Sequence, residues 1–149
     1  MDRQTTPGLD VDVELTRLVR QIRTRSMRNL ATIHPRLDYS TFVLLLAIVD
    51  DKRGARASDL ADNLQVHKST VSRAVRALTD MGLVDRAPDP DDGRSQVLTP
   101  TAEGRARVDA YRAHAHEQVA AGLAGWDRSD LSTLANLLGR LNGIFAQMD

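Results

Sequence analysis

Residues 68–81 carry hydroxyl and guanidinium groups at helical spacing. If this segment is a helix, one of its faces holds four polar side chains: Ser69, Ser72, Arg73 and Arg76. Arginine can donate two parallel hydrogen bonds to the O6 and N7 atoms of guanine, and serine or threonine can bond bases and phosphates. Lys68 and Thr70 lie in the first turn, where free backbone N–H groups and the helix dipole favour a phosphate. This pattern predicts contacts with DNA.

The distribution of charge favours the same prediction. The whole chain has a formal net charge of zero, with Lys+Arg 20 and Asp+Glu 20, so its overall charge indicates no nucleic-acid partner. Between Asp62 and Asp80, however, there is no acidic residue. Such a local excess of positive charge is typical of a surface that binds phosphates. An ordinary solvated helix face that lacks acids by chance is the alternative. All but two of the 20 basic residues are Arg, which either GC-rich codon usage or selection for bidentate contacts explains.

The elements around this face form a known supersecondary pattern. Val71, Val75 and Leu78 recur at helical spacing and would bury the opposite face of the helix that runs from Lys68 to about Met81. A short amphipathic helix begins at Ser58 and is followed by a turn at residues 65–67. Gly82 suits the end of the second helix. Two short helices joined by a tight turn predict a helix-turn-helix.

Two short strands are expected after Gly82. Residues 83–86 and 95–98 are typical of strands, and residues 87–94 between them contain two prolines, three acids and a glycine. We therefore predict a β-hairpin with a long loop at its tip. Beside a helix-turn-helix, such a hairpin is called a wing.

The flanking segments are predicted to be helical. Residues 1–8 are expected to form a flexible leader, and a helix runs from Leu9 to Ile33 or His34, because Pro35 prevents its continuation. Asp38 is the expected N-cap of an apolar helix over 39–49, although this run is also compatible with a buried strand. Residues 50–57 are expected to form a polar loop. Thr99 is predicted to cap a helix over 100–123 that begins with Pro100.

The last predicted helix carries an apolar stripe. Asp127 and Asp130 resemble a capping box at its start, and its stripe is formed by Leu131, Leu134, Leu138, Leu141, Phe145 and Met148. The first helix carries a similar stripe. The two stripes could pack on one another within one chain or pair across two chains, and a dimer would match two DNA half-sites.

Several classes of protein lack support in the sequence. Cysteine is absent, which excludes disulfides, thiolate metal sites and thiol-based redox sensing. His114 and His116 fall on different faces of a helix, so we expect no metal site. Without a nucleophile elbow or a Gly-rich phosphate loop, we expect neither an enzyme nor a cofactor. The start of the chain lacks the apolar region of a signal peptide, and the longest apolar run, 42–49, is too short to span a bilayer. We expect a cytoplasmic protein with no membrane partner.

Residues 58–105 closely resemble the winged helix-turn-helix of the MarR family (multiple antibiotic resistance regulators). Three motifs in order carry the likeness: Ser-Thr-Val-Ser-Arg at 69–73, Gly-Leu-Val-Asp-Arg at 82–86, and Asp-Pro-Asp-Asp-Gly-Arg at 89–94, followed by Leu98-Thr99. The resemblance implies a mainly α fold with a small β-hairpin wing. A winged helix-turn-helix region over 37–99 would be flanked by dimerisation helices at 9–34 and 100–149.

The resemblance also implies roles for individual residues. Helix 68–81 would enter the major groove of DNA, and the residues expected to contact bases or phosphates are Lys68, Ser69, Thr70, Ser72, Arg73 and Arg76. Arg86 is a secondary candidate. Arg94 would reach the minor groove, supported by Asp92, whereas from the residues alone Arg94 could equally pair with Asp91 or Asp92. Many family members have Gly where this chain has Gln65, so either Gln65 adopts a strained φ or the turn differs.

The expected function is a sequence-specific, double-stranded DNA-binding transcription regulator. It would be a homodimeric repressor relieved by a small phenolic or anionic effector, which family members often bind in a cleft between the dimerisation helices and the winged domain. His34, Tyr39 and Phe42 could line such a cleft, although Phe42 is more simply a core residue, and the ligand-binding residues are unknown. The alternative is a winged-helix dimer acting as a protein-interaction scaffold without specific DNA binding.

Overall fold

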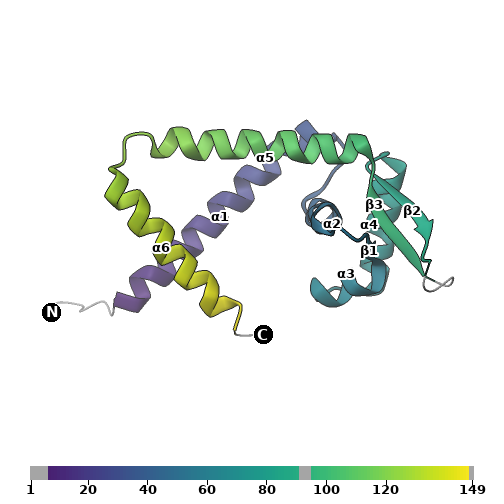
Figure 1. Ribbon diagram of the computed structural model, residues 1–149, viewed down its shortest axis with the longest axis horizontal. Coiled ribbons are helices and arrows are strands. Elements are labelled where there is room, and N and C mark those ends of the chain that lie inside the picture. Colours follow the sequence, from purple (N-terminus) through teal and green to yellow (C-terminus); the bar gives the residue numbers. More distant parts are fainter. Residues whose placement is uncertain (1–6, 91–94, 148–149) are drawn as a thin grey trace. The chain divides into compact units, whose positions relative to one another are not determined.

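The computed structural model describes residues 7–90 and 95–147 (Figure 1). The chain forms two compact units, residues 1–111 and residues 112–149. The predicted leader, 1–8, lies mostly outside the described residues, but its last two residues already belong to the first helix, which begins at Pro7. The described part of the chain contains no helix long and apolar enough to cross a membrane.

The first unit contains the helix-turn-helix and the sheet. Its helices are α1 (Pro7–Ile33), α2 (Tyr39–Asp50), α3 (Ala57–Asn63) and α4 (Lys68–Asp80), together with the first part of α5 (Ala102–Leu123). The apolar run at 42–49 is therefore helical. Asp38 caps α2 as predicted, because its carboxylate accepts a hydrogen bond of 2.9 Å from the Thr41 N–H.

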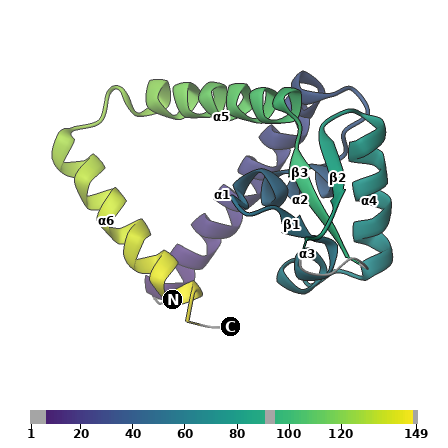
Figure 2. The same ribbon diagram turned by 45° about the vertical axis from the view of Figure 1, so that its right-hand side comes forward.

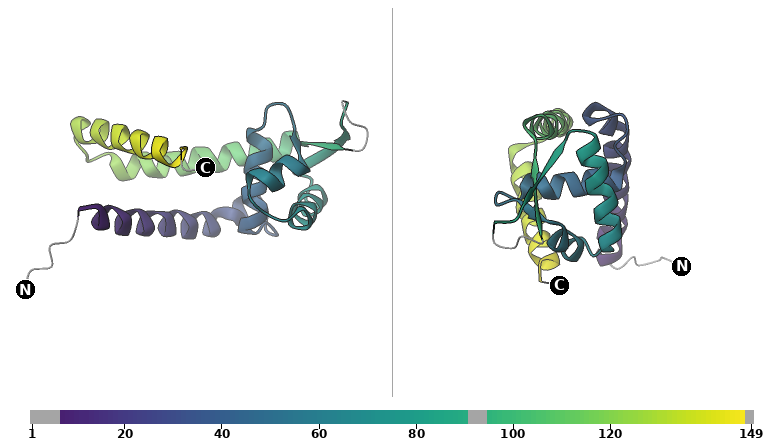
Figure 3. Two further views of the ribbon diagram at one scale, coloured as in Figure 1. Left: turned by 90° about the horizontal axis from the view of Figure 1, so that it is seen from below. Right: turned by 90° about the vertical axis from the view of Figure 1, so that its right-hand side faces the viewer.

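A three-stranded antiparallel sheet completes the first unit. The strands are β1 (Ala55–Arg56), β2 (Val84–Pro88) and β3 (Gln96–Pro100), and β3 lies between the other two (Figure 2). Arg56 on β1 and Ala87 on β2 both pair with Val97. The hairpin of β2 and β3 extends away from helices α2–α4 (Figure 3). The sequence did not predict β1, because two residues are too few to show an alternating pattern.

Both strands of the hairpin end two residues later than predicted. Ala87 and Pro88 belong to β2 rather than to the loop, and Thr99 and Pro100 belong to β3 rather than to the helix that follows. Proline is tolerated at the end of a strand, where the N–H it lacks is not needed. The hydroxyl of Thr101 instead caps α5, because it accepts a hydrogen bond of 2.9 Å from the Gly104 N–H.

One core holds the first unit together. Side chains with 1% exposure or less come from α1, α2, α4, β2, β3, α5 and the residue before β2, and they include Ile33, Leu45, Ile48, Val71, Leu78, Leu83, Val84, Leu98 and Val108. Phe42 is also buried, which confirms its interpretation as a core residue. Its ring packs edge-on against Tyr111 with 5.0 Å between the centroids. Because α4 contributes Val71 and Leu78 to this core, the core fixes the orientation of that helix.

The second unit contains the end of α5 and α6 (Arg128–Phe145). Asp127 occupies the N-cap position of α6 as predicted, but in the described structure its side chain makes no capping hydrogen bond, so the capping box does not form on that side. Among the residues described for α6, none is buried. Its large exposed apolar side chains are Leu137, Leu138, Ile144 and Phe145.

Candidate nucleic-acid interface

The two faces of α4 separate as the sequence predicts. Val71, Val75 and Leu78 are buried against the core, whereas the exposed polar side chains of the same helix include Lys68, Ser69, Ser72, Arg73 and Arg76, with Thr79 and Asp80 in its last turn. Thr70 is half-buried at the margin of this face. We call Lys68, Ser69, Thr70, Ser72, Arg73 and Arg76 the α4 polar face. The structure therefore brings together on one accessible surface all the α4 residues singled out in the sequence.

The start of α4 is electrostatically suited to an anion. His67 occupies the N-cap position, and the first turn contains no acid. Within the described part of the chain, the His67 side chain makes no capping hydrogen bond, while its backbone carbonyl accepts from the N–H of Thr70 at 2.8 Å. The partial positive charge of a 13-residue helix thus faces outward unopposed by a carboxylate of its own first turn.

The turn before α4 contains a strained residue. Gln65 has a φ of +51°, in the left-handed region that favours glycine. Its N–H donates to the Asp62 carbonyl at 3.1 Å, and the N–H of Val66 donates to the Ala61 carbonyl at 3.0 Å. These two bonds form a Schellman motif at the end of α3. Of the two alternatives for this position, the strained φ is the one that occurs.

The end of α4 closes in the same way. Gly82 has a φ of +69°, its N–H donates to the Thr79 carbonyl at 2.9 Å, and that of Leu83 donates to the Leu78 carbonyl at 3.0 Å. Both helices of the helix-turn-helix therefore end in a Schellman motif. The left-handed residue is Gln65 after α3 and Gly82 after α4. The predicted role of Gly82 is confirmed.

Arg73 lies beside the beginning of α2. A hollow of about 310 Å³ is lined by both helices: Asp38, Ser40, Thr41, Thr70, Arg73, Ala74 and Ala77. Partial burial alone would raise the pKa of Asp38, but hydrogen bonds from the Ser40 hydroxyl, the Thr41 N–H and the Thr41 hydroxyl outweigh it and lower that pKa. The Asp38 carboxylate is therefore held by hydrogen bonds to the first residues of α2.

Arg86 contacts the end of α4 from the hairpin. Its Nε donates to the hydroxyl of Thr79 at 3.2 Å, and that hydroxyl donates to the Val75 carbonyl at 2.9 Å. Arg86 is exposed and is the central residue of β2, paired with Leu98, rather than a residue at the base of the hairpin. Arg94, with Asp91 and Asp92, lies outside the described residues.

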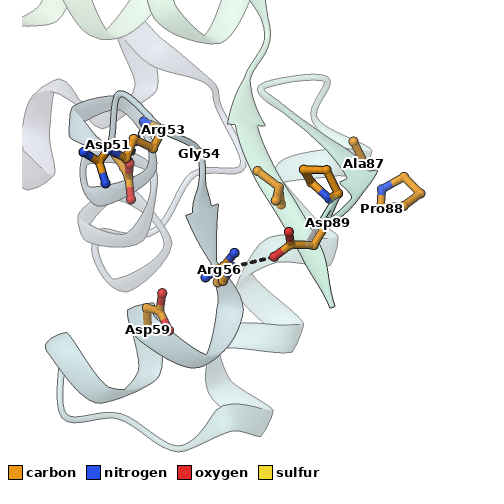
Figure 4. A pocket seen from close by; sticks show the side chains of 10 residues that line it. Asp51, Arg53, Gly54, Arg56, Asp59, Ala87, Pro88 and Asp89 are labelled. Carbon is orange, nitrogen blue, oxygen red and sulfur yellow. Dashed lines mark hydrogen bonds and ion pairs between the residues drawn. The ribbon is translucent and has the colours of Figure 1, made fainter. Parts of the chain in front are cut away.

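The sequence reasoning missed a second hollow, lined by charged residues of both signs, with Asp51, Asp59 and Asp89 beside two arginines. Arg53 and Arg56 line this hollow of about 650 Å³ between β1, the start of α3 and the end of β2 (Figure 4). The Arg56 Nε donates to the Asp89 carboxylate at 2.5 Å. Residues 50–57 were interpreted only as a polar loop. No spacing pattern in the sequence connects two residues 33 positions apart.

Tyr39 lies at the junction of α1 and α2. The guanidinium of Arg23 is 5.2 Å from the centroid of the Tyr39 ring, which is close enough for a cation–π interaction. Tyr39 is half-buried, and so is His34. The sequence suggested these two positions for an effector, together with Phe42, which is buried in the core.

A helix-turn-helix followed by a two-stranded hairpin defines the winged helix-turn-helix class of DNA-binding proteins. Comparison with known proteins indicates which family within this class the chain resembles. A family model described as the MarR family matches residues 39–96, which extend from α2 to the start of β3.

Curated relatives agree with this match. The uncharacterized HTH-type transcriptional regulator YxaD of Bacillus subtilis is 32% identical over 102 residues, which cover 68% of this chain and 71% of that protein. The uncharacterized HTH-type transcriptional regulator Mb0904 of Mycobacterium bovis is 28% identical over 134 residues, covering 90% and 89%. The Streptococcus pneumoniae protein FabT, solved in complex with DNA, has a TM-score of 0.82 at 16% identity, covering 95% of this chain and 99% of that one, and at this identity it shows the shared fold.

The chain belongs to the MarR family and is a DNA-binding transcription regulator. The sequence resemblance and the predicted fold class, mainly α with a small β-hairpin wing, are confirmed.

Proposed function

We propose that this chain is a homodimeric, sequence-specific repressor that binds operator DNA and releases it when a small effector binds. The α4 polar face carries the proposal. It combines two arginines, two serines and an unopposed helix N-terminus on the side of α4 that faces away from the core. A scaffold that binds only protein has no need of these cationic and hydroxyl groups beside a helix N-terminus whose first turn contains no acid.

Each residue of the face has a proposed role. Arg73 and Arg76 form the bidentate contacts with base edges or phosphates in the major groove, and Ser69 and Ser72 add hydroxyl contacts to them. Lys68 and Thr70 bind a phosphate at the start of α4. Arg86 contacts the DNA backbone from the middle of β2, and Arg94 enters the adjacent minor groove, where the negative potential attracts arginine.

The proposed dimer uses the helices at the two ends of the chain. The dimerisation segments are 9–34 and 100–149, and the DNA-binding region is 37–99. Exposed apolar side chains on α1 and α6 support this assignment: Val11, Val13, Leu18, Val19, Ile22, Met27, Leu137, Leu138, Ile144 and Phe145. Large apolar groups in such number are typical of surfaces that another protein covers. A two-fold dimer would place its recognition helices in half-sites about 34–36 Å apart.

The proposed effector is a phenolic or anionic small molecule. Arginines on α1 and the half-buried Tyr39 support this chemistry, since Arg23 already lies over the Tyr39 ring. The regulator is proposed to act in the cytoplasm, in contact with the DNA that it controls. No cofactor enters the proposed mechanism.

The experiment is a binding titration of the purified protein with duplex DNA from upstream of its own gene, over a series of salt concentrations. We expect tight binding whose logarithm falls linearly with the logarithm of salt concentration, with a slope of about −0.9 per phosphate contacted. A random-sequence duplex of the same length is the control. The scaffold alternative would be favoured if binding were weak and equal on both duplexes. Duplexes selected from a randomised pool would then also bind no more tightly than the random-sequence control.

A further inference from the structure

Arg56 and Asp89 form an ion pair across the sheet. The side chain of Asp89 is 1% exposed and that of Arg56 is 43% exposed, and 2.5 Å separates the Arg56 Nε from the Asp89 Oδ2 (Figure 4). A buried carboxylate is costly unless a cation or hydrogen bonds offset its lost hydration. The Arg56 guanidinium therefore offsets part of the cost of burying this carboxylate.

The pair joins elements that are not neighbours in the sheet. Arg56 ends β1 and is also the N-cap residue of α3, the first helix of the helix-turn-helix. Asp89 directly follows β2, and its N–H donates to the Ser95 carbonyl at 3.0 Å, closing the base of the hairpin tip. Because β3 lies between β1 and β2, the pair spans the central strand. It connects the helix-turn-helix to the hairpin independently of the strand hydrogen bonds.

We propose that Arg56 and Asp89 are a positioning pair, which holds the end of β2 next to the hairpin tip at a fixed place relative to α3 and α4. The role assigned to the pair rests on the proposed function, in which α4 and the hairpin enter neighbouring grooves of one DNA duplex. Two contacts that must be made together bind more tightly when their spacing is set before binding, because less conformational freedom is lost. Neither residue needs to touch DNA for this effect.

The direction in which Asp89→Asn changes DNA affinity distinguishes a positioning role from a purely electrostatic one. Asp89→Asn removes a negative charge near the DNA-binding region, so a purely electrostatic effect would strengthen DNA binding. It also removes the charge that holds Arg56. We therefore expect Asp89→Asn to weaken binding to a duplex selected by the wild-type protein from a randomised pool, by about tenfold.

Two arginine variants complete the design. Arg56→Gln should weaken the same binding by a similar factor, and Arg56→Lys should restore part of it, because lysine keeps the charge but not the planar guanidinium. Arg53→Gln is the matched control. Arg53 lines the same hollow and is exposed, so this variant removes an equal charge without touching the pair, and its smaller loss measures the electrostatic background.

Footprinting shows where the binding is lost. In Asp89→Asn we expect weaker protection of the minor groove from hydroxyl radicals beside each half-site, with protection of major-groove guanines from methylation retained at saturating protein. Amide exchange in the free protein is a readout without DNA. Exchange at the Asp89 N–H, which donates to the Ser95 carbonyl, should accelerate by about tenfold, while exchange in α4 stays unchanged.

The outcomes are distinct. Unchanged or tighter binding by Asp89→Asn, with unchanged exchange at position 89, overturns the proposal. Equal loss of both kinds of protection, together with faster exchange throughout the first unit, indicates a merely structural pair and also overturns it. If the wild-type protein selects no duplex, the proposed function fails instead, and the exchange measurement still decides whether the pair holds the hairpin. If Asp89→Asn does not fold, the comparison of Arg56→Gln, Arg56→Lys and Arg53→Gln decides in its place.

Discussion

Gly104 of α5 lies directly against the backbone of Leu83. A Cβ added to Gly104 would overlap the Leu83 carbonyl oxygen and lie 2.9 Å from the carbonyl carbon. The same carbonyl accepts a hydrogen bond of 3.1 Å from the N–H of Thr101, and the Thr101 hydroxyl donates to the Gly82 carbonyl at 2.8 Å. The start of α5 is therefore locked onto the segment between α4 and β2.

This contact predicts that Gly104→Ala destabilises the protein. The methyl group meets backbone rather than a flexible side chain, so we expect a loss of about 1–3 kcal/mol in the free energy of unfolding, measured by urea denaturation. Gly122 of the same helix is the control, because a Cβ there meets no atom within 4 Å in the described structure. Gly122→Ala should be neutral or stabilising by up to about 1 kcal/mol. Equal effects of the two substitutions would contradict the close packing.

The left-handed conformation of Gln65 predicts a stabilising substitution. Gln65→Gly removes the conformational cost of a φ of +51°, and we expect a gain of about 1 kcal/mol in the free energy of unfolding. Gln65→Ala is the control, since alanine keeps the cost and removes only the side chain. Thermal melts of the three proteins measure the effect. The prediction fails if alanine stabilises as much as glycine.

The cap of α2 predicts a stability difference that depends on pH. Asp38→Ala removes the carboxylate that accepts three hydrogen bonds at the start of α2. Near neutral pH we expect the free energy of unfolding to fall by about 1 kcal/mol. Because the pKa of Asp38 is lowered in the folded state from the ordinary 3.8, the contribution is complete above that value. It disappears as the pH falls through the lower folded pKa.

Urea denaturation of Asp38→Ala from pH 7 to pH 3 measures this dependence. Asp127→Ala is the matched control, since Asp127 is an N-cap residue whose side chain makes no capping bond in the described structure. It should change stability by a few tenths of a kcal/mol. The prediction is contradicted if the difference in the free energy of unfolding between wild type and Asp38→Ala increases as the pH falls toward 3.

Substitutions in the α4 polar face predict a loss of DNA affinity without a loss of stability. Arg73→Ala and Arg76→Ala should each weaken specific binding by about 1–3 kcal/mol if the arginine contacts a base. If it contacts only a phosphate, the salt slope falls by about 1. Arg105→Ala, an exposed arginine on α5, should leave affinity unchanged. Unchanged affinity for both α4 variants would exclude this helix as the reading element.

The apolar stripe of α6 predicts the effect of charge on assembly. Leu134→Glu and Leu141→Glu should dissociate the dimer in sedimentation experiments, because each places a charge within the proposed interface. Ser132→Glu, on an exposed position of the same helix, is the control for added charge alone. An intact dimer in both leucine variants would show that α6 is not part of the interface.

The sequence was sufficient for features that depend on local patterns. Apolar residues at helical spacing predicted the two faces of α4, and glycine predicted the end of that helix at Gly82. It was misleading for Thr99 and Pro100, because Thr-Pro is an equally good start of a helix when the pairing of Pro100 with Val84 is unknown. It was silent on the contact of Arg56 with Asp89, which only the order of strands in the sheet brings together.

A helix without buried side chains has a thermodynamic consequence. Among the residues described for α6, none is buried, and an 18-residue helix in water is only marginally stable by itself. If a second copy covers α6, its folding and its association become one equilibrium, governed by mass action. Dilution alone should then reduce helical content and lower the melting temperature. The amount of regulator in the cell would set the fraction of chains that are fully folded as well as the fraction that are paired.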